Sequence, residues 1–284
     1  MVLDHGAPSS PARCLNWSDR GRVLQRRNIV GGMQDVVFLP GIVAPVSVRY
    51  GPLLERLPGV NAILKDLEVY ATEEPPARYS VQTEIDGIEA AADNAGLERF
   101  HLYGHSGGAA CALAYVAAHP DRVLSLTVDE PASDFSQADR EDPYWQDIDA
   151  ATALTGPEAV RAFLALQVAP NVDLPDPPKE TPPWMSKRPA GMRVFASALR
   201  RHTVSPAHMA AFDRPVLFTF GSLTHPRWIR MRDRLERVFP TFSSEKFDGL
   251  HHLNTSHQAE PDRTARLLAG FWRHADSSRC LNRA

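Results

Sequence analysis

Short apolar runs alternate with amphipathic segments through the first half of the chain. Residues 36–39 form an apolar run that begins with two β-branched valines and ends at a Pro-Gly pair, which is typical of a strand buried on both faces. Residues 67–70 are a second, weaker strand candidate. In residues 82–95 the apolar side chains recur at helical spacing, and Gly96 follows where a C-cap glycine belongs. The pattern therefore predicts two strands followed by a helix.

The next residues continue this alternation. Residues 100–103 predict a strand that ends at Gly104, and residues 107–119 predict a helix of small side chains that Pro120 stops. Residues 123–128 predict a further strand. Strands that alternate with helices are typical of a parallel sheet covered by helices on both faces, so we predict an α/β fold.

Residues 133–206 interrupt the pattern, because they contain no convincing strand. Apolar helical stretches lie near residues 159–166 and 192–199, and a proline-rich stretch lies between them. The segment is too long for a plain loop in a compact domain, so we predict a mostly helical insertion. The pattern then resumes with strand 215–220, helix 226–238, strand 244–247 and helix 260–274. The predicted organisation is a core at 13–132 and 207–276, the insertion at 133–206, and flexible tails at 1–12 and 277–284.

The composition argues against several classes of function. The chain has 43% hydrophobic residues and a formal net charge of −3, so no basic stripe suggests a nucleic-acid partner. No apolar run approaches the roughly 20 residues that cross a bilayer, and the N-terminus does not resemble a signal peptide. The three widely spaced cysteines match no metal site. We expect a cytoplasmic monomer or homodimer that acts on a small molecule and uses no metal or other cofactor.

One pentapeptide contains a candidate catalytic residue. Residues 104–108 read Gly-His-Ser-Gly-Gly, which fits G-x-S-x-G, and they lie between a predicted strand and a predicted helix. A serine at such a sharp turn is presented at the helix N-terminus, where free N–H groups favour negative charge. The flanking glycines leave room that a Cβ would fill. Ser106 is therefore the candidate nucleophile.

With these motifs the chain resembles the α/β-hydrolase family over roughly residues 20–276. The resemblance rests on residues 38–42, the pentapeptide, residues 121–132 and a histidine segment near the C-terminus. It implies a mostly parallel, eight-stranded sheet with helices on both faces. It also implies a helical cap inserted after strand six, which is where residues 133–206 lie.

The serine needs a base, since its hydroxyl is a weak nucleophile at neutral pH. The resemblance places a histidine after the last strand, and residues 248–254 occupy that place with two adjacent candidates. The usual spacing of the family selects His252, and His251 remains the alternative.

The acid of the candidate triad departs from the commonest family pattern. No carboxylate follows strand 215–220 until Asp233, and the position where relatives place an aspartate holds the neutral Thr224. Some relatives, which include zearalenone lactone hydrolases and certain haloalkane dehalogenases, place a glutamate after strand six instead. Glu130 stands at the matching position, so we favour it as the acid, with Asp129 as its rival.

The tetrahedral intermediate of acyl transfer needs N–H donors aimed at its oxyanion. The resemblance assigns these to the backbone of Gly107, directly after the nucleophile, and of Ile42, in the loop after strand 36–39. Substrate preference is expected to lie in the insertion. Its large apolar side chains are the candidate pocket residues, namely Trp145, Phe163, Trp184, Met185, Met192 and Phe195.

The nucleophile limits the reaction class. Relatives that open epoxides or displace halides attack with a carboxylate, which Ser106 is not. Acyl transfer to water remains, and we predict hydrolysis of a small apolar carboxylic ester or lactone through an acyl-enzyme. The alternatives are carbon–carbon bond hydrolysis or transfer to an acceptor other than water, as in an acyltransferase or perhydrolase. A ligand receptor without turnover is a further alternative.

Overall fold

The computed structural model describes residues 33–176 and 179–281. Its centre is a parallel sheet of six strands in the order β2-β1-β3-β4-β5-β6. The strands are β1 (Gln34–Leu39), β2 (Val60–Leu64), β3 (Phe100–His105), β4 (Val123–Asp129), β5 (Val216–Gly221) and β6 (Phe242–Phe247). The central strands β3 and β4 are buried at every position, as expected for a sheet that is covered on both faces.

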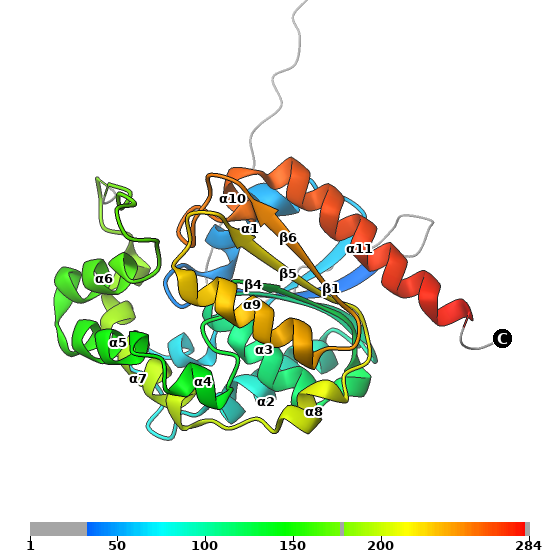
Figure 1. The fold of residues 1–284 in the computed structure, drawn as a ribbon, viewed down its shortest axis with the longest axis horizontal. Helices are drawn as coiled ribbons and strands as arrows, with labels where there is room; N and C mark the ends of the chain where they lie inside the picture. Colours follow the sequence, from blue (N-terminus) through cyan, green and yellow to red (C-terminus); the bar gives the residue numbers. More distant parts are fainter. Residues whose placement is uncertain (1–32, 177–178, 282–284) are drawn as a thin grey trace, which may run out of the picture.

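Helices cover both faces of this sheet (Figure 1). One face packs against α1 (Val46–Leu54) and α11 (Pro261–Leu281), with Trp272 at the centre of that smaller core. The opposite face is covered by α2 (Val81–Asn94), α3 (Gly107–Ala118) and α9 (Pro226–Val238), which belong to the main core. The short helix α10 (Ser256–Ala259) precedes α11. Side chains of alternating direction along each strand supply the two cores.

The segment between β4 and β5 is helical, as the sequence predicts. In Figure 1 its helices α5, α6 and α7 lie together at the left, to one side of the sheet. The helices of this stretch are α4 (Gln137–Arg140), α5 (Tyr144–Ala153), α6 (Gly156–Ala165), α7 (Arg188–Arg201) and α8 (Pro206–Ala210). The described residues of this stretch add no strand to the sheet, and Val168 forms one isolated bridge to Thr224, which lies beyond the end of β5.

One predicted strand is wrong. Residues 67–70 do not join the sheet, because Glu68–Tyr70 forms a turn of 3-10 helix. The Glu84 carboxylate accepts hydrogen bonds from the backbone N–H groups of Glu68 and Val69, and it holds this turn in place. The strand that pairs with β1 is instead Val60–Leu64, whose edge position leaves most of its side chains half-buried. The apolar pattern at 67–70 reflects a buried turn.

Two further predictions need adjustment. Helix α11 extends to Leu281, so residues 277–281 are helical and do not form the loose tail that we expected. The predicted tail at residues 1–12 lies outside the described residues. Six strands are found in the described residues, and the predicted total of eight is not confirmed.

Candidate active site

Ser106 sits at a sharp turn between β3 and α3. Its backbone has φ 52° and ψ −116°, a left-handed conformation that residues other than glycine rarely adopt. The turn is fixed on both sides, because the N–H of Ser106 donates to the Asp129 carbonyl at 2.9 Å and its own carbonyl accepts from the N–H of Ala132 at 2.9 Å. Such strain costs about 1–3 kcal/mol and persists where the surrounding structure enforces it.

Two glycines make this turn possible. A Cβ on Gly104 would lie 2.6 Å from the backbone of Ala109, and a Cβ on Gly108 would lie 2.4 Å from the carbonyl oxygen of Pro40. Both distances are shorter than any tolerable contact. The G-x-S-x-G pattern is therefore required by the close approach of α3 to β3 and to the loop after β1.

A continuous line of hydrogen bonds starts at the serine. His252 Nε2 lies 2.9 Å from Ser106 Oγ, and His252 Nδ1 lies 2.7 Å from Glu130 Oε2. The other carboxylate oxygen of Glu130 accepts from the N–H of Gly221 at 2.8 Å. All three side chains are at least 95% buried. The structure thus brings together the three residues that we favoured as nucleophile, base and acid.

Burial shapes the protonation of this group. Burial, followed by the positive charge of Arg49, lowers the pKa of His252 from 6.5 to about 3. Burial and the neighbouring Asp129 carboxylate raise the pKa of Glu130 well above its ordinary value, although the Gly221 N–H bond opposes this rise. A neutral His252 is the form that accepts a proton from a serine hydroxyl.

An indole ring supports the histidine. Trp228, in α9, stacks on the His252 imidazole with a centroid separation of 4.4 Å and an interplanar angle of 20°. Its Nε1–H donates to the Pro131 carbonyl at 2.8 Å, which fixes the indole plane. Trp228 is fully buried, so this contact restricts the rotation of the His252 ring.

The rival acid has a different partner. Asp129 Oδ2 lies 2.9 Å from His257 Nδ1 and accepts from the Tyr103 hydroxyl at 3.3 Å, and none of its hydrogen bonds involves His252. The side chain of His257 is fully buried. Burial and Arg49 lower the pKa of His257 to about 4.

The rival base also points elsewhere. The ring nitrogen Nδ1 of His251 accepts from the N–H of Leu253, and its backbone N–H donates to the Asn254 side chain. No hydrogen bond joins it to Ser106 within the described part of the chain. His251 therefore shapes the turn that presents His252.

A buried arginine from α1 ties this turn to the core. The Arg49 guanidinium donates to Gln258 Oε1 at 3.1 Å, to Thr255 Oγ1 at 3.1 Å and to the His252 carbonyl at 3.4 Å. It also lies 2.9 Å from Nε2 of His105, the residue before the candidate nucleophile. Arg49 thereby connects both sides of the serine–histidine contact.

The expected oxyanion donors lie next to each other. A Cβ on Gly107 would be 3.6 Å from the Ile42 Cβ, so the two residues face one another across the site. Over the described residues, no hydrogen bond is found from the backbone N–H of Gly107 or of Ile42. Both amides are thus available to a ligand beside Ser106.

Two small pockets meet at Ser106, and they share Ser106, Ile42, Phe163 and Gln167. The inner pocket, of about 30 Å³, is bounded mainly by the insertion, and its other lining residues are Gly107, Ala132, Tyr144, Trp145, Ile148, Met192, Phe195, Ala196 and Leu199. The outer pocket, of about 190 Å³, also contains Gly41, Val43, Ala44, Arg49, His105, Leu164, Pro175, His252 and Leu253. These pockets have different walls on either side of the candidate nucleophile.

Four of the six expected pocket residues lie beside Ser106, namely Trp145, Phe163, Met192 and Phe195. The other two do not line either pocket. Trp184 lies against the Arg188 guanidinium, 5.2 Å from ring centroid to Cζ, and Met185 lines a separate cavity within the insertion. Apolar character alone did not separate residues that face Ser106 from those that pack inside the insertion.

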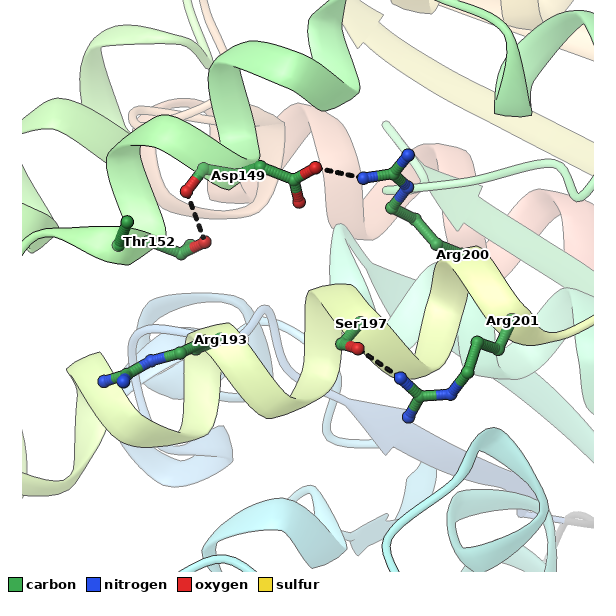
Figure 2. Close-up of a pocket in the computed structure, with 7 residues that line it drawn as sticks. Asp149, Thr152, Arg193, Ser197, Arg200 and Arg201 are labelled. Carbon is green, nitrogen blue, oxygen red and sulfur yellow. Dashed lines mark hydrogen bonds and ion pairs between the residues drawn. The ribbon is translucent and has the colours of Figure 1, made fainter.

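Larger hollows lie away from the serine. The pocket in Figure 2, of about 400 Å³, lies between α5 and α7, where Asp149 faces Arg200 and Ser197 faces Arg201. Another, of about 740 Å³, lies within the insertion. Neither is lined by Ser106 or His252. Pocket volume therefore does not identify the candidate site. The hydrogen-bonded side chains at Ser106 identify it.

Residues 33–176 and 179–281 contain no cluster of three or more histidine, cysteine, aspartate or glutamate side chains that could hold a metal ion. No helix within the same ranges is long and apolar enough to cross a membrane.

Comparison with known proteins identifies the fold family of this chain. A family model for the alpha/beta hydrolase fold matches residues 36–251, which is about three quarters of the chain. The chain belongs to the α/β hydrolase fold family. This membership supports the prediction that the protein is an enzyme of the hydrolase class, and it agrees with the parallel sheet and its covering helices.

Solved structures share this hydrolase fold at low sequence identity. A thermophilic esterase from Thermogutta terrifontis is 15% identical with a TM-score of 0.66, covering 86% of this chain and 91% of that one. A carboxylesterase from Bacillus subtilis is 17% identical (TM-score 0.59, coverage 84% and 83%). An alpha/beta hydrolase from Sphaerobacter thermophilus is 23% identical (TM-score 0.57, coverage 85% and 93%). No curated protein gives a significant match.

Sequence reasoning missed three side chains of this hydrolase's candidate site. Arg49 and Trp228 reach His252 from helices that carry no motif. His105 was visible within the pentapeptide, but its bond to Arg49 joins residues 56 positions apart. Contacts of this kind depend on how α1 and α9 pack, which the sequence pattern does not specify.

Proposed function

We propose that this chain is a serine hydrolase that cleaves a carboxylic ester or lactone, with Ser106 as nucleophile, His252 as base and Glu130 as acid. The observation that supports this most directly is the hydrogen-bonded line Ser106–His252–Glu130, with its distances of 2.9 and 2.7 Å. This is the geometry in which a histidine removes a serine proton while a carboxylate fixes its tautomer.

In the first half of the reaction, Ser106 Oγ attacks the carbonyl carbon and its proton passes to His252 Nε2. The carbonyl oxygen becomes an oxyanion in the tetrahedral intermediate. The bond from carbon to the leaving oxygen then breaks, and His252 returns the proton to that oxygen. An alcohol leaves, and the acyl group remains as an ester of Ser106.

In the second half, a water molecule repeats the sequence. His252 removes a proton from the water, whose oxygen attacks the acyl carbon. The bond to Ser106 Oγ breaks as His252 returns the proton to that oxygen, so a carboxylic acid leaves and the serine is restored. Glu130 holds Nδ1–H of His252 throughout and stabilises the imidazolium that forms transiently.

The oxyanion would be stabilised by the backbone N–H groups of Gly107 and Ile42. The two residues face each other beside Ser106, and their amides have no other partner within the described residues. Gly107 also lies at the first turn of α3, where the free N–H groups of the helix carry partial positive charge. Removing one such donor costs about 100- to 1,000-fold in turnover in a comparable site.

The experiment compares wild type with Ser106→Ala on p-nitrophenyl acetate, a small lactone, and matched reactions with added alcohol or peroxide. We expect hydrolysis by wild type and a loss of roughly 10⁴-fold or more in Ser106→Ala. Ser277→Ala, which removes an exposed hydroxyl on α11, is the matched control and should keep wild-type rates. Equal turnover in wild type and Ser106→Ala would contradict the proposal. Products formed only with the added acceptor would support the acyltransferase or perhydrolase alternative.

A further inference from the structure

The two pockets beside Ser106 differ in which catalytic group they contain. The inner pocket includes Gly107 but no histidine, and the outer pocket includes His252 but not Gly107. The nucleophile itself lies where they meet. A substrate that reacts with Ser106 must therefore extend into both pockets or leave one of them empty.

The chemistry decides which part of an ester enters which pocket. The tetrahedral carbon carries Ser106 Oγ, the oxyanion, the leaving oxygen and the acyl chain. The leaving oxygen must face His252, because it receives its proton from that ring. The leaving group thus extends into the outer pocket, and the acyl chain is left with the inner pocket.

The inner pocket is narrow. Its volume of about 30 Å³ compares with about 10–15 Å³ for the space that admits one water molecule. Trp145, Met192 and Phe195 wall it, and each is at most 4% exposed. The Phe195 ring lies directly over the turn, since a Cβ on Gly107 would meet it at 3.0 Å. A chain longer than about three carbon atoms would displace these packed side chains.

The outer pocket is larger and less buried. Its volume is about 190 Å³, against about 30 Å³ for the inner pocket, and half-exposed side chains such as Val43 line it. The polar side chains Gln167 and Tyr144 of the inner pocket bond to each other. The inner pocket therefore suits a small group, and the outer one accepts a bulkier group.

We propose that the substrate is an ester of a short, apolar acyl group, of about two or three carbons, with a larger alcohol, and that Met192 and Phe195 set this limit. The inference rests on the proposed function and narrows it, since a macrocyclic lactone would have to fit a long acyl chain into the inner pocket.

The test measures kcat/KM for p-nitrophenyl acetate, propionate, butyrate, hexanoate and octanoate, in which only the acyl chain changes. Wild type should fall at least about tenfold from propionate to hexanoate, because a misfit of one or more methylenes is worth about that factor or more. Equal rates on acetate and octanoate, both dependent on Ser106, would overturn the assignment of the inner pocket to the acyl chain.

Enlarging the inner pocket should shift the acyl-chain preference toward longer chains. Met192→Ala and Phe195→Ala should each raise the ratio of hexanoate to acetate kcat/KM at least about tenfold. Met192→Ala remains informative if Phe195→Ala fails to fold. Val43→Ala, which lines the outer pocket alone, is the control and should leave this ratio unchanged. A shift in Val43→Ala, or none in a folded Met192→Ala, would contradict the proposal.

Different results would contradict the proposed function and the assignment of the two pockets. If wild type hydrolyses no ester of the series, or if Ser106→Ala retains the activity, the proposed function itself is wrong. If hydrolysis depends on Ser106 but the chain-length profile is flat, only the assignment of the pockets is wrong.

Discussion

Two buried acid–histidine pairs lie side by side in this molecule, and their acids are consecutive residues. Glu130 pairs with His252 at 2.7 Å, and Asp129 pairs with His257 at 2.9 Å. All four side chains are at least 96% buried. Only the Glu130 pair continues to Ser106, whereas the Asp129 pair continues to the Tyr103 hydroxyl. A buried carboxylate thus pairs with a histidine twice, once beside the candidate nucleophile and once away from it.

The difference arises from the end of β4. Asp129 is the last residue of the strand, and its side chain enters the aromatic layer of the smaller core, where Tyr50 packs 4.9 Å from the His257 ring. Glu130 follows with φ 47°, which turns its side chain toward the N–H of Gly221 at the end of β5. One change of backbone direction therefore sends adjacent carboxylates to different partners. We infer that the Glu130 pair serves catalysis and that the Asp129 pair holds residues 251–257 against the core.

The largest expected contrast is between the two histidines. His252→Gln should lower kcat by at least about 10⁴-fold, because the serine loses its base. His257→Gln should keep kcat within about tenfold of wild type. It should lower the free energy of unfolding by about 1–3 kcal/mol, since the Asp129 carboxylate loses a buried partner.

Steady-state kinetics on a short-chain ester and urea denaturation measure these two effects. Matched folding of His252→Gln and wild type is the control for the kinetic loss. A similar loss of turnover in the two variants, or a His257→Gln variant as stable as wild type, would contradict this division of roles between the two histidines.

A smaller effect concerns pH. Protonated His252 cannot accept the serine proton, so activity is lost as pH falls through the pKa of this ring. Burial and Arg49 lower that pKa from 6.5 to about 3, so the acid limb of kcat/KM should lie below pH 6.5. Arg49→Gln removes a positive charge that disfavours the imidazolium, and the limb should move to higher pH. A wild-type limb at or above pH 6.5, or a downward shift in Arg49→Gln, would contradict this account.

The sequence predicts most of the core, because buried parallel strands and small-residue helices have strong local patterns. The strand before Ser106 and the helix after it lie where the pattern placed them. The pattern failed for β2, an edge strand whose half-buried residues give a weak signal, and for the buried turn at Glu68–Tyr70 that Glu84 holds.

Within the site, local motifs were informative and long-range packing was not. The spacing usual in the family that the chain resembles selects His252, and the lack of a carboxylate near Thr224, where relatives place one, pointed to Glu130. Both side chains lie in line with Ser106. The burial of His257 could not be predicted, since it depends on the Asp129 side chain, 128 positions away. The stacking of Trp228 on His252 likewise depends on the packing of α9.

In the proposed mechanism Glu130, and not its neighbour Asp129, orients His252. The most direct test is kcat on p-nitrophenyl acetate for Glu130→Gln and Asp129→Asn, two changes that each replace a carboxylate by an amide of the same size. We predict a loss of roughly 10³- to 10⁴-fold for Glu130→Gln, because the amide no longer stabilises the imidazolium, and a loss below about tenfold for Asp129→Asn. A larger loss in Asp129→Asn than in Glu130→Gln would contradict it.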